Sequence, residues 1–446
     1  MPNFAGWIPI LAIHVRTNRA YWLVASRRSV SPLPANRNCP AFFAQSQIGR
    51  LRSCLVGQID LSHRDFFLGQ LQTKFAVSRL KVRPERGFSQ VTPIAFIEPK
   101  KPDFNRIQEL LSQSDLENHW SNFGPVWQRL KSFIEIRLKL PSSRVAIPCA
   151  SGTQALTAAA AITARNPADK PWLVSAFGFR STIIGPFADA RIVDCDTGGV
   201  LSIEEVTRLD PSTFGGIVVT NPFGLCSDFS GHLRLARCLE KPLILDNAAG
   251  FDSIDRSDHA GVLECLSLHH TKPFGFGEGG CLIVDAELET RARAAINLGY
   301  GQFTTESARY CGNGKLSEPA AAFILSRLES ENSWVPSYRT ELMRLSRLAS
   351  QLDIPQLQEP PHPSTSVYGQ LALLADCDVT SDELSSNVVT LRKYYPPLSA
   401  NAPVANAIYR RIVNLPAHPG MASISDREIE ELLLRFCCSA KTRALV

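Results

Sequence analysis

The sequence predicts an α/β protein in which helices cover both faces of a mostly parallel central sheet. Six short apolar runs, rich in Val, Ile and Leu, alternate with segments of helical periodicity in the middle of the chain. Continuous apolar runs of this length are typical of strands that are buried on both faces. The succession of strand, helix and strand favours parallel pairing through right-handed crossovers. Such sheets bind ligands at the carboxyl ends of their strands, so we expect the chemistry at that edge.

The predicted strands are PWLVSAF (171–177), ARIVDCD (190–196), GGIVVTN (215–221), KPLILDN (241–247), CLSLHH (265–270) and GGCLIVD (279–285). Apolar residues at helical spacing predict helices at 103–116, 125–138, 155–164, 202–209 and 232–240. A long helix from residue 319 onward and a closing helix from residue 426 are assigned to a second α/β unit.

The domain prediction follows from length and from an uneven distribution of charge. With 446 residues, 44% of them hydrophobic, the chain can bury a large core and a second, smaller one. We predict a large domain at 91–325 and a small C-terminal domain at 326–446. Residues 1–90 hold 13 Lys and Arg against 3 Asp and Glu and show no sustained periodicity. This basic arm is expected to be a disordered or non-native extension.

Composition argues against several classes of protein. No apolar run approaches the roughly 20 residues that span a bilayer, so no membrane partner is expected. Outside the basic arm, acidic residues outnumber basic ones, so a nucleic-acid partner is not supported. The 12 cysteines show neither metal-ligand spacing nor the density of a disulfide scaffold, which favours a cytoplasmic location.

Two motifs allow both an ordinary and a functional interpretation. The stretch SGTQALTAAAA (151–161) places a Ser-Gly-Thr turn before a helix, which suits either an ordinary N-cap or a phosphate site. The run LILDNAAGF (243–251) ends on Asp246, which could be a turn former or the partner of a buried cation such as a protonated ring nitrogen.

The third motif is LSLHHTKPFGFGEGG (266–280), in which Lys272 follows a predicted strand. The lysine could be a solvated loop cation, or an amine whose pKa is lowered enough to form a Schiff base with a carbonyl. A metal site at His269 and His270 is not predicted, because adjacent strand residues point to opposite faces. We expect one of the two histidines to border the pocket and the other to pack. The glycines lack the G-x-G-x-x-G spacing of a dinucleotide loop.

The phosphate-site turn, the strand-end aspartate and the strand-end lysine together suit pyridoxal 5′-phosphate. Each group matches one part of that cofactor: the turn matches its phosphate, the aspartate its pyridinium nitrogen and the lysine its aldehyde. The ordered motifs SGT…AL, LILDNAAGFDS, SLHHTKPFGFGEGG and CGNGKLSEPAAAFIL resemble the DegT/StrS-type sugar aminotransferases. The resemblance extends from about residue 93 to 437 and implies a fold-type-I pyridoxal-phosphate transferase.

The resemblance assigns roles residue by residue. It makes Lys272 the lysine that forms the Schiff base and later moves a proton between the donor and the cofactor. It makes Asp246 the partner of the pyridinium nitrogen, and it assigns Gly152, Thr153 and Ser267 to the phosphate. No metal is implied.

Two further residues carry over, and one position departs from the family. Phe179, in SAFGFRST, matches the aromatic that stacks on the ring, although Phe177 or Phe179 could simply be core. Asn313 resembles the asparagine that reaches the phosphate from a neighbouring subunit, which implies a homodimer with shared active sites. Ala249 stands where many relatives have a Gln or His beside the ring hydroxyl of the cofactor.

The resemblance implies transfer of an amino group from glutamate to a nucleotide-linked keto-sugar, for amino-sugar and polysaccharide biosynthesis. The motifs GNGKLSE and DNAAGFDS are most similar to those of dTDP-4-amino-4,6-dideoxyglucose-type transaminases, which suggests a dTDP-4-keto-6-deoxy sugar as substrate. The alternatives are a sugar dehydratase of the same fold, in which histidine replaces the lysine, and a non-catalytic pyridoxal-phosphate-binding regulator.

Overall fold

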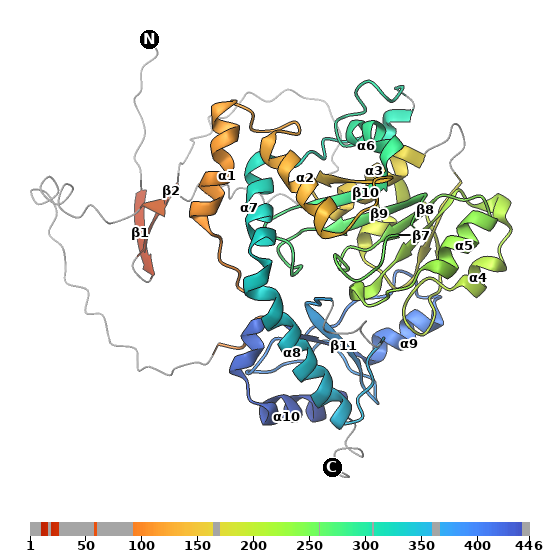
Figure 1. The fold of residues 1–446 in the computed structure, drawn as a ribbon. Helices are drawn as coiled ribbons and strands as arrows, with labels where there is room; N and C mark the ends of the chain where they lie inside the picture. The colour runs from red at the N-terminus through yellow and green to blue at the C-terminus, as the bar shows by residue number, and fades with distance from the viewer. Residues whose placement is uncertain are drawn as a thin grey trace, which may run out of the picture. The chain divides into compact units, whose positions relative to one another are not determined.

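In the computed structural model, a seven-stranded sheet forms the core of the unit at 89–446. Figure 1 shows its strands β7, β8, β9 and β10 side by side. The structure describes residues 92–163, 170–257, 259–305, 307–358 and 366–438, and the backbone of 10–16, 19–25 and 58–59. The sheet has the order β4-β10-β9-β8-β7-β5-β6. Its strands are β4 (Arg144–Cys149), β5 (Trp172–Ser175), β6 (Arg191–Val193), β7 (Gly216–Thr220), β8 (Leu243–Asp246), β9 (Val262–Ser267) and β10 (Gly280–Asp285).

The prediction of a mostly parallel sheet is confirmed. Strands β6, β5, β7, β8 and β9 pair in parallel, whereas β10 runs antiparallel to both β9 and β4. All six predicted strands are present, and β4 is one that the sequence did not reveal. It contains Pro148, which lacks a backbone N–H, and such a residue is tolerated because β4 lies at the end of the sheet.

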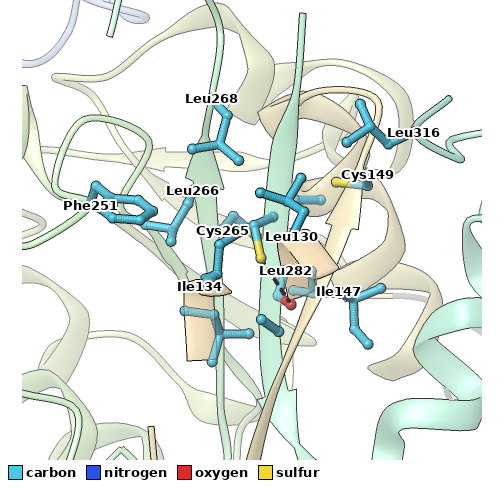
Figure 2. Packing of buried hydrophobic residues seen from close by; sticks show 14 of the residues in the cluster. Leu130, Ile134, Ile147, Cys149, Phe251, Cys265, Leu266, Leu268, Leu282 and Leu316 are labelled. Carbon is cyan, nitrogen blue, oxygen red and sulfur yellow. Dashed lines mark hydrogen bonds between the residues drawn. The ribbon is translucent and has the colours of Figure 1, made fainter. Parts of the chain in front are cut away.

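The strands are buried on both faces, as their continuous apolar runs predict. Val218 and Ile244 belong to one hydrophobic cluster, whereas Ile217 and Leu245 belong to another. Successive side chains of a strand point to opposite faces, so each run supplies both clusters in alternation. Figure 2 shows the first cluster, with Leu266 of β9 and Leu282 of β10 among its members.

Helices cover the sheet on the side of this first cluster. Helix α3 packs against β8, β9 and β10, and α2 packs against β4 and α7. Figure 1 shows α1, α2 and α7 beside one another. The helices are α1 (Phe104–Leu116), α2 (Pro125–Arg137), α3 (Gly152–Thr163), α4 (Ile203–Thr207), α5 (Ser230–Cys238), α6 (Glu289–Ala295), α7 (Glu318–Glu329), α8 (Glu331–Gln351), α9 (Pro403–Arg411) and α10 (Asp426–Cys437).

The long helix predicted from residue 319 onward is two helices, because the chain breaks at Ser330. The Ser330 hydroxyl donates to the carbonyl of Arg327, 2.9 Å away, and the indole of Trp334 donates to the same carbonyl at 3.1 Å. Local bonds of this kind compete with the helical pattern. Strands β11 (Gln370–Leu374) and β12 (Ile412–Pro416) then form an antiparallel pair among α8, α9 and α10.

A second core fills the C-terminal part of the chain, where Leu345, Leu373, Val413 and Ile429 are fully buried or nearly so. This core also takes in Phe177 from the central region, and residues 89–446 form one compact unit. The division of this unit near residue 325 stays a prediction.

Before residue 89, three strands form a small antiparallel sheet: β1 (Ile10–Arg16), β2 (Arg19–Ala25) and β3 (Gln58–Ile59). The prediction for the rest of the basic arm lies outside the described residues. In the part of the chain that the structure describes, no helix is both long and apolar enough to cross a membrane.

Candidate active site

A pocket of about 420 Å³ lies at the carboxyl ends of the central strands. Thr220 ends β7 and Asp246 ends β8, and the two residues are partners in the parallel register. Ser267 ends β9, and all three residues line the pocket. The carboxyl ends of parallel strands meet at one edge of a sheet, so residues distant in sequence converge here.

The structure brings six of the seven predicted site residues together around this pocket. They are Gly152, Thr153, Phe179, Asp246, Ser267 and Lys272. Asn313 is not among the residues that line the pocket, and its side-chain oxygen accepts a hydrogen bond from Lys315 at 2.6 Å.

Asp246 is a buried carboxyl group with few compensating partners. Its exposed fraction is 3%, and desolvation raises its pKa from the ordinary 3.8 to about 6. The positive charge of Lys272 and a hydrogen bond from the backbone N–H of Ala248 oppose that rise. A cation placed against this carboxyl group would stabilise its ionised form.

Lys272 lies in the loop between β9 and β10, facing the same pocket. Burial lowers the pKa of its ammonium group, and the charge of Asp246 works in the opposite direction. A lowered pKa leaves more of the neutral amine, which is the nucleophilic form. Lys272 is only partly exposed and lines the pocket, which favours the Schiff-base interpretation over that of a solvated loop cation.

The glycines of this loop permit close backbone contacts. A Cβ on Gly275 would lie 2.1 Å from the carbonyl oxygen of His269, so the turn after Lys272 has no room for a side chain. A Cβ on Gly280 would lie 2.5 Å from the backbone nitrogen of Gly152. The start of β10 is thereby held directly against the first turn of α3.

The first turn of α3 borders the pocket through Ser151, Gly152 and Thr153. The Ser151 hydroxyl accepts a hydrogen bond from the backbone N–H of Gln154 at 3.2 Å, which is an ordinary capping contact. The first N–H groups of a helix have no acceptor within the helix, so those beside the cap can bind an anion. Ser267 lies next to this turn, because a Cβ on Gly152 would be 3.1 Å from its Cβ.

Aromatic side chains form another wall. Phe179 is 59% exposed and lines the pocket, whereas Phe177 is fully buried in the core. Tyr395 also lines the pocket and contacts Phe179 edge to face, with ring centroids 6.2 Å apart. It stacks on Phe223 at 4.8 Å, so the C-terminal part of the chain contributes to the site.

The two histidines lie beyond the end of β9 and not on a strand, which corrects the geometry assumed for them. His269 lines the pocket and hydrogen-bonds the Thr271 hydroxyl at 2.8 Å. His270 packs edge to face on Phe276, with the ring centroids 5.3 Å apart. The expectation that one histidine borders the pocket and the other packs is confirmed. Among the described residues, no group of three or more His, Cys, Asp or Glu side chains could hold a metal ion.

Sequence reasoning missed Thr220, Tyr394 and Tyr395, which also line the pocket. Thr220 could have been found, because it ends the predicted strand GGIVVTN and strand ends form the binding edge. Tyr394 and Tyr395, in RKYYPPL, could not have been found in this way. The sequence of that segment does not show that it packs against the carboxyl edge of the sheet.

The residues of the pocket fit pyridoxal phosphate. Asp246 offers a desolvated carboxylate for the ring nitrogen, and α3 offers free N–H groups for the phosphate. The Thr220 hydroxyl is buried, faces the pocket and has no hydrogen-bond partner, so it can serve a polar group of a bound ligand. Ala249 also lines the pocket and cannot make the contact that a Gln or His would make there.

Fold and pocket define the class of protein as a fold-type-I transferase with pyridoxal phosphate as its cofactor. The sequence profile of the DegT/DnrJ/EryC1/StrS aminotransferase family matches residues 105–433. The chain belongs to this family and is a sugar aminotransferase.

Several known proteins are similar to this chain in sequence or in fold. The protein Rv3402c of Mycobacterium tuberculosis is 31% identical over 382 residues, which are 77% of this chain and 90% of the relative. A putative PLP-dependent aminotransferase from Bacillus cereus has a similar fold, with a TM-score of 0.66, 20% identity, and coverage of 77% of this chain and 99% of that one. DesI, solved in the presence of its TDP-sugar product, gives a TM-score of 0.62 at 19% identity, over 79% of this chain and 95% of that one.

Proposed function

We propose that the protein moves an amino group from glutamate to a nucleotide-linked keto-sugar, in the biosynthesis of an amino sugar or polysaccharide. The observation that carries this proposal is the convergence of Lys272, Asp246 and the first turn of α3 on one pocket. A dTDP-4-keto-6-deoxy sugar is the proposed acceptor. The motifs GNGKLSE and DNAAGFDS support that choice, as does the similarity in fold to DesI, whose product is a TDP-sugar.

Pyridoxal phosphate, when bound, supplies an aldehyde that takes up the amino group and a ring that accepts electrons. Asp246 would hold the ring nitrogen protonated, and its burial makes this ion pair stronger than it would be in water. Gly152 and Thr153 would bind the phosphate through backbone N–H groups and a hydroxyl, with Ser267 adding a second hydroxyl.

Lys272 has two proposed tasks. Its neutral amine, favoured by the lowered pKa, would bind the cofactor aldehyde, whose oxygen would leave as water. When it is not bonded to the cofactor, the same Nζ would take up and return a proton at the Cα of the amino-acid donor. Phe179 would lie against the ring face, and together with Tyr395 it would exclude water.

Absorption spectra test this proposal directly. The purified protein with added pyridoxal phosphate is expected to develop a visible band, and Lys272→Ala should abolish it. The matched control is Lys101→Ala, which replaces an exposed lysine and should keep the band. Absence of the band from the wild-type protein would contradict the role of Lys272.

Half-reactions then identify the chemistry. Glutamate should bleach the band, and a dTDP-4-keto-6-deoxy sugar should restore it, whereas the same nucleotide sugar without the keto group should not. Bleaching that no keto-sugar reverses would favour an amino-acid aminotransferase or a regulator over a sugar aminotransferase. The sugar-dehydratase alternative is less well supported, because this chain carries Lys272 where those enzymes carry histidine.

The finer proposals are a homodimer with shared active sites and a cytoplasmic location. Asn313 supports the first, because it does not line the pocket of its own chain and could reach a partner's site. The buried free thiols of Cys149, Cys265 and Cys281 support the second. Sedimentation of the purified protein would show the mass of a monomer if the dimer proposal is wrong.

A further inference from the structure

A short segment that precedes the family match runs from the C-terminal part of the chain to the loop of Lys272. We call residues 94–100 the strap. At its start, the N–H of Ile94 donates to Val388 at 2.9 Å, and the Ile94 carbonyl accepts from Thr390 at 2.8 Å. One residue on, the carbonyl of Ala95 is 2.8 Å from Nε2 of His418. The strap is therefore held in place before it reaches the pocket.

Lys100 ends the strap and binds the loop of Lys272 through main-chain atoms alone. Its ammonium donates to the carbonyl oxygens of His270 at 2.8 Å and Gly275 at 2.7 Å, and also to the carbonyl of Lys272 itself. An ammonium group has three hydrogens, and here each has one carbonyl acceptor. The three carbonyls bracket the turn that presents the Lys272 side chain.

The same turn is closed by its own hydrogen bonds. The N–H of Lys272 donates to His269 at 2.9 Å, and the N–H of Gly275 donates to the carbonyl of Lys272 at 3.0 Å. These bonds leave the carbonyls of His270 and Gly275 pointing to one place, which Lys100 fills. Several carbonyl oxygens turned toward one point repel each other, and a cation between them removes that repulsion.

Glu98 and Arg327 lie close to Lys100 and act on its charge in opposite directions. Glu98 forms an ion pair with Arg327 at 2.7 Å and accepts from the hydroxyl of Tyr338 at 3.1 Å. Arg327 also donates to the carbonyl of Pro273 at 3.2 Å, so it contacts the same loop. Burial and Arg327 lower the pKa of Lys100 to about 7, and Glu98 opposes this. Two basic side chains, Lys100 and Arg327, therefore bind carbonyl oxygens of this loop, and Glu98 forms an ion pair with Arg327.

We propose that Lys100 is a positioning residue that fixes the backbone of Lys272, so that the Lys272 amine points at the cofactor aldehyde. This inference rests on the proposed role of Lys272. A side chain with four rotatable bonds reaches a defined point only if its Cα is fixed, and a displacement of about 1 Å at a reacting atom can slow a reaction roughly 100-fold. The family profile begins at residue 105, so Lys100 lies outside the part of the chain that it matches.

The test compares Lys100→Met with Lys101→Met in the full chain. Both substitutions remove one ammonium group, but Lys101 is exposed and forms none of the loop contacts. At saturating pyridoxal phosphate, Lys100→Met should form the visible band roughly tenfold or more slowly than wild type. Lys101→Met should match wild type, and Lys100→Arg, which keeps a cation with several donors, should recover most of the rate.

The pH titration of the band is a second measurement that a merely structural role would not change. Lys100→Met should shift its midpoint, because the environment of the Lys272 nitrogen changes with its position. The proposal would be overturned if Lys100→Met formed the band at the wild-type rate and with the wild-type titration midpoint. It would be overturned equally if the variant lost thermal stability while this rate and this midpoint stayed unchanged. Where Lys100→Met does not fold, Lys100→Gln, which keeps two N–H donors without the charge, replaces it. A wild-type protein without any band would instead count against the role of Lys272.

Discussion

Replacing Asp246 by Asn is expected to stabilise the cofactor-free protein at pH 8 while it weakens cofactor binding. The carboxyl group is 3% exposed, and desolvation raises its pKa to about 6. An Asn side chain is nearly the same size and keeps an oxygen that can accept the hydrogen bond from Ala248. The substitution therefore removes a buried charge and little else.

The magnitude follows from the shift in pKa. A rise from 3.8 to about 6 corresponds to about 3 kcal/mol at a pH well above 6, since one pKa unit is about 1.4 kcal/mol. The folded state binds more protons than the unfolded state between about pH 4 and 6, so stability is lost as the pH rises through that window. The Asn variant escapes this loss. The figure of about 3 kcal/mol already includes the attraction between Asp246 and Lys272, because that attraction contributes to the net shift in pKa.

Urea unfolding of the cofactor-free proteins measures the effect. The difference between Asp246→Asn and wild type should be largest at pH 8 and should shrink as the pH is lowered toward 4. Asp189→Asn, at an exposed site, is the matched control and should show neither feature. Added pyridoxal phosphate should stabilise wild type more than the variant. Equal or lower stability of the variant at pH 8 would refute the reasoning.

Two other substitutions separate binding from folding. Thr220→Val removes a buried hydroxyl that has no partner, so we expect unchanged or slightly higher stability but a several-fold weaker affinity for pyridoxal phosphate, measured by titration. Equal affinity would show that the hydroxyl does not serve the cofactor. Glu318→Ala should lower the free energy of unfolding by about 3 kcal/mol or more, because Glu318 accepts from Ser114, Val126 and Trp127 at 2.7–3.0 Å. An unchanged urea midpoint would contradict this.

The fold was largely predictable because its strands are buried on both faces, which leaves continuous apolar runs in the sequence. Strand β4 escaped because Pro148 interrupts its run, and a proline is compatible with a strand only at the end of a sheet. The break between α7 and α8 escaped for another reason. Ser330 competes with the helix through a local hydrogen bond that helical periodicity does not register.

The site was predictable where it is built from strand ends. Asp246 and Ser267 lie in predicted strands and Lys272 follows one, and a parallel sheet brings the ends of its strands to one edge. Tyr395 and Lys100 were not predictable in this way. Each reaches the pocket or its loop through contacts far apart in sequence, and no local pattern encodes such a contact.

The residues that line the pocket are far apart in the sequence, which determines when the pocket can form during synthesis. Phe96 and Tyr395 both line it, and about 300 residues separate them, or roughly 15–60 s of ribosomal synthesis. Strand β4 likewise waits for β10 before it gains a partner. A nascent chain therefore holds no complete pocket until nearly all of the described sequence has been translated. Pyridoxal phosphate would then find its complete pocket only after the segment that holds Tyr395 has been made and folded.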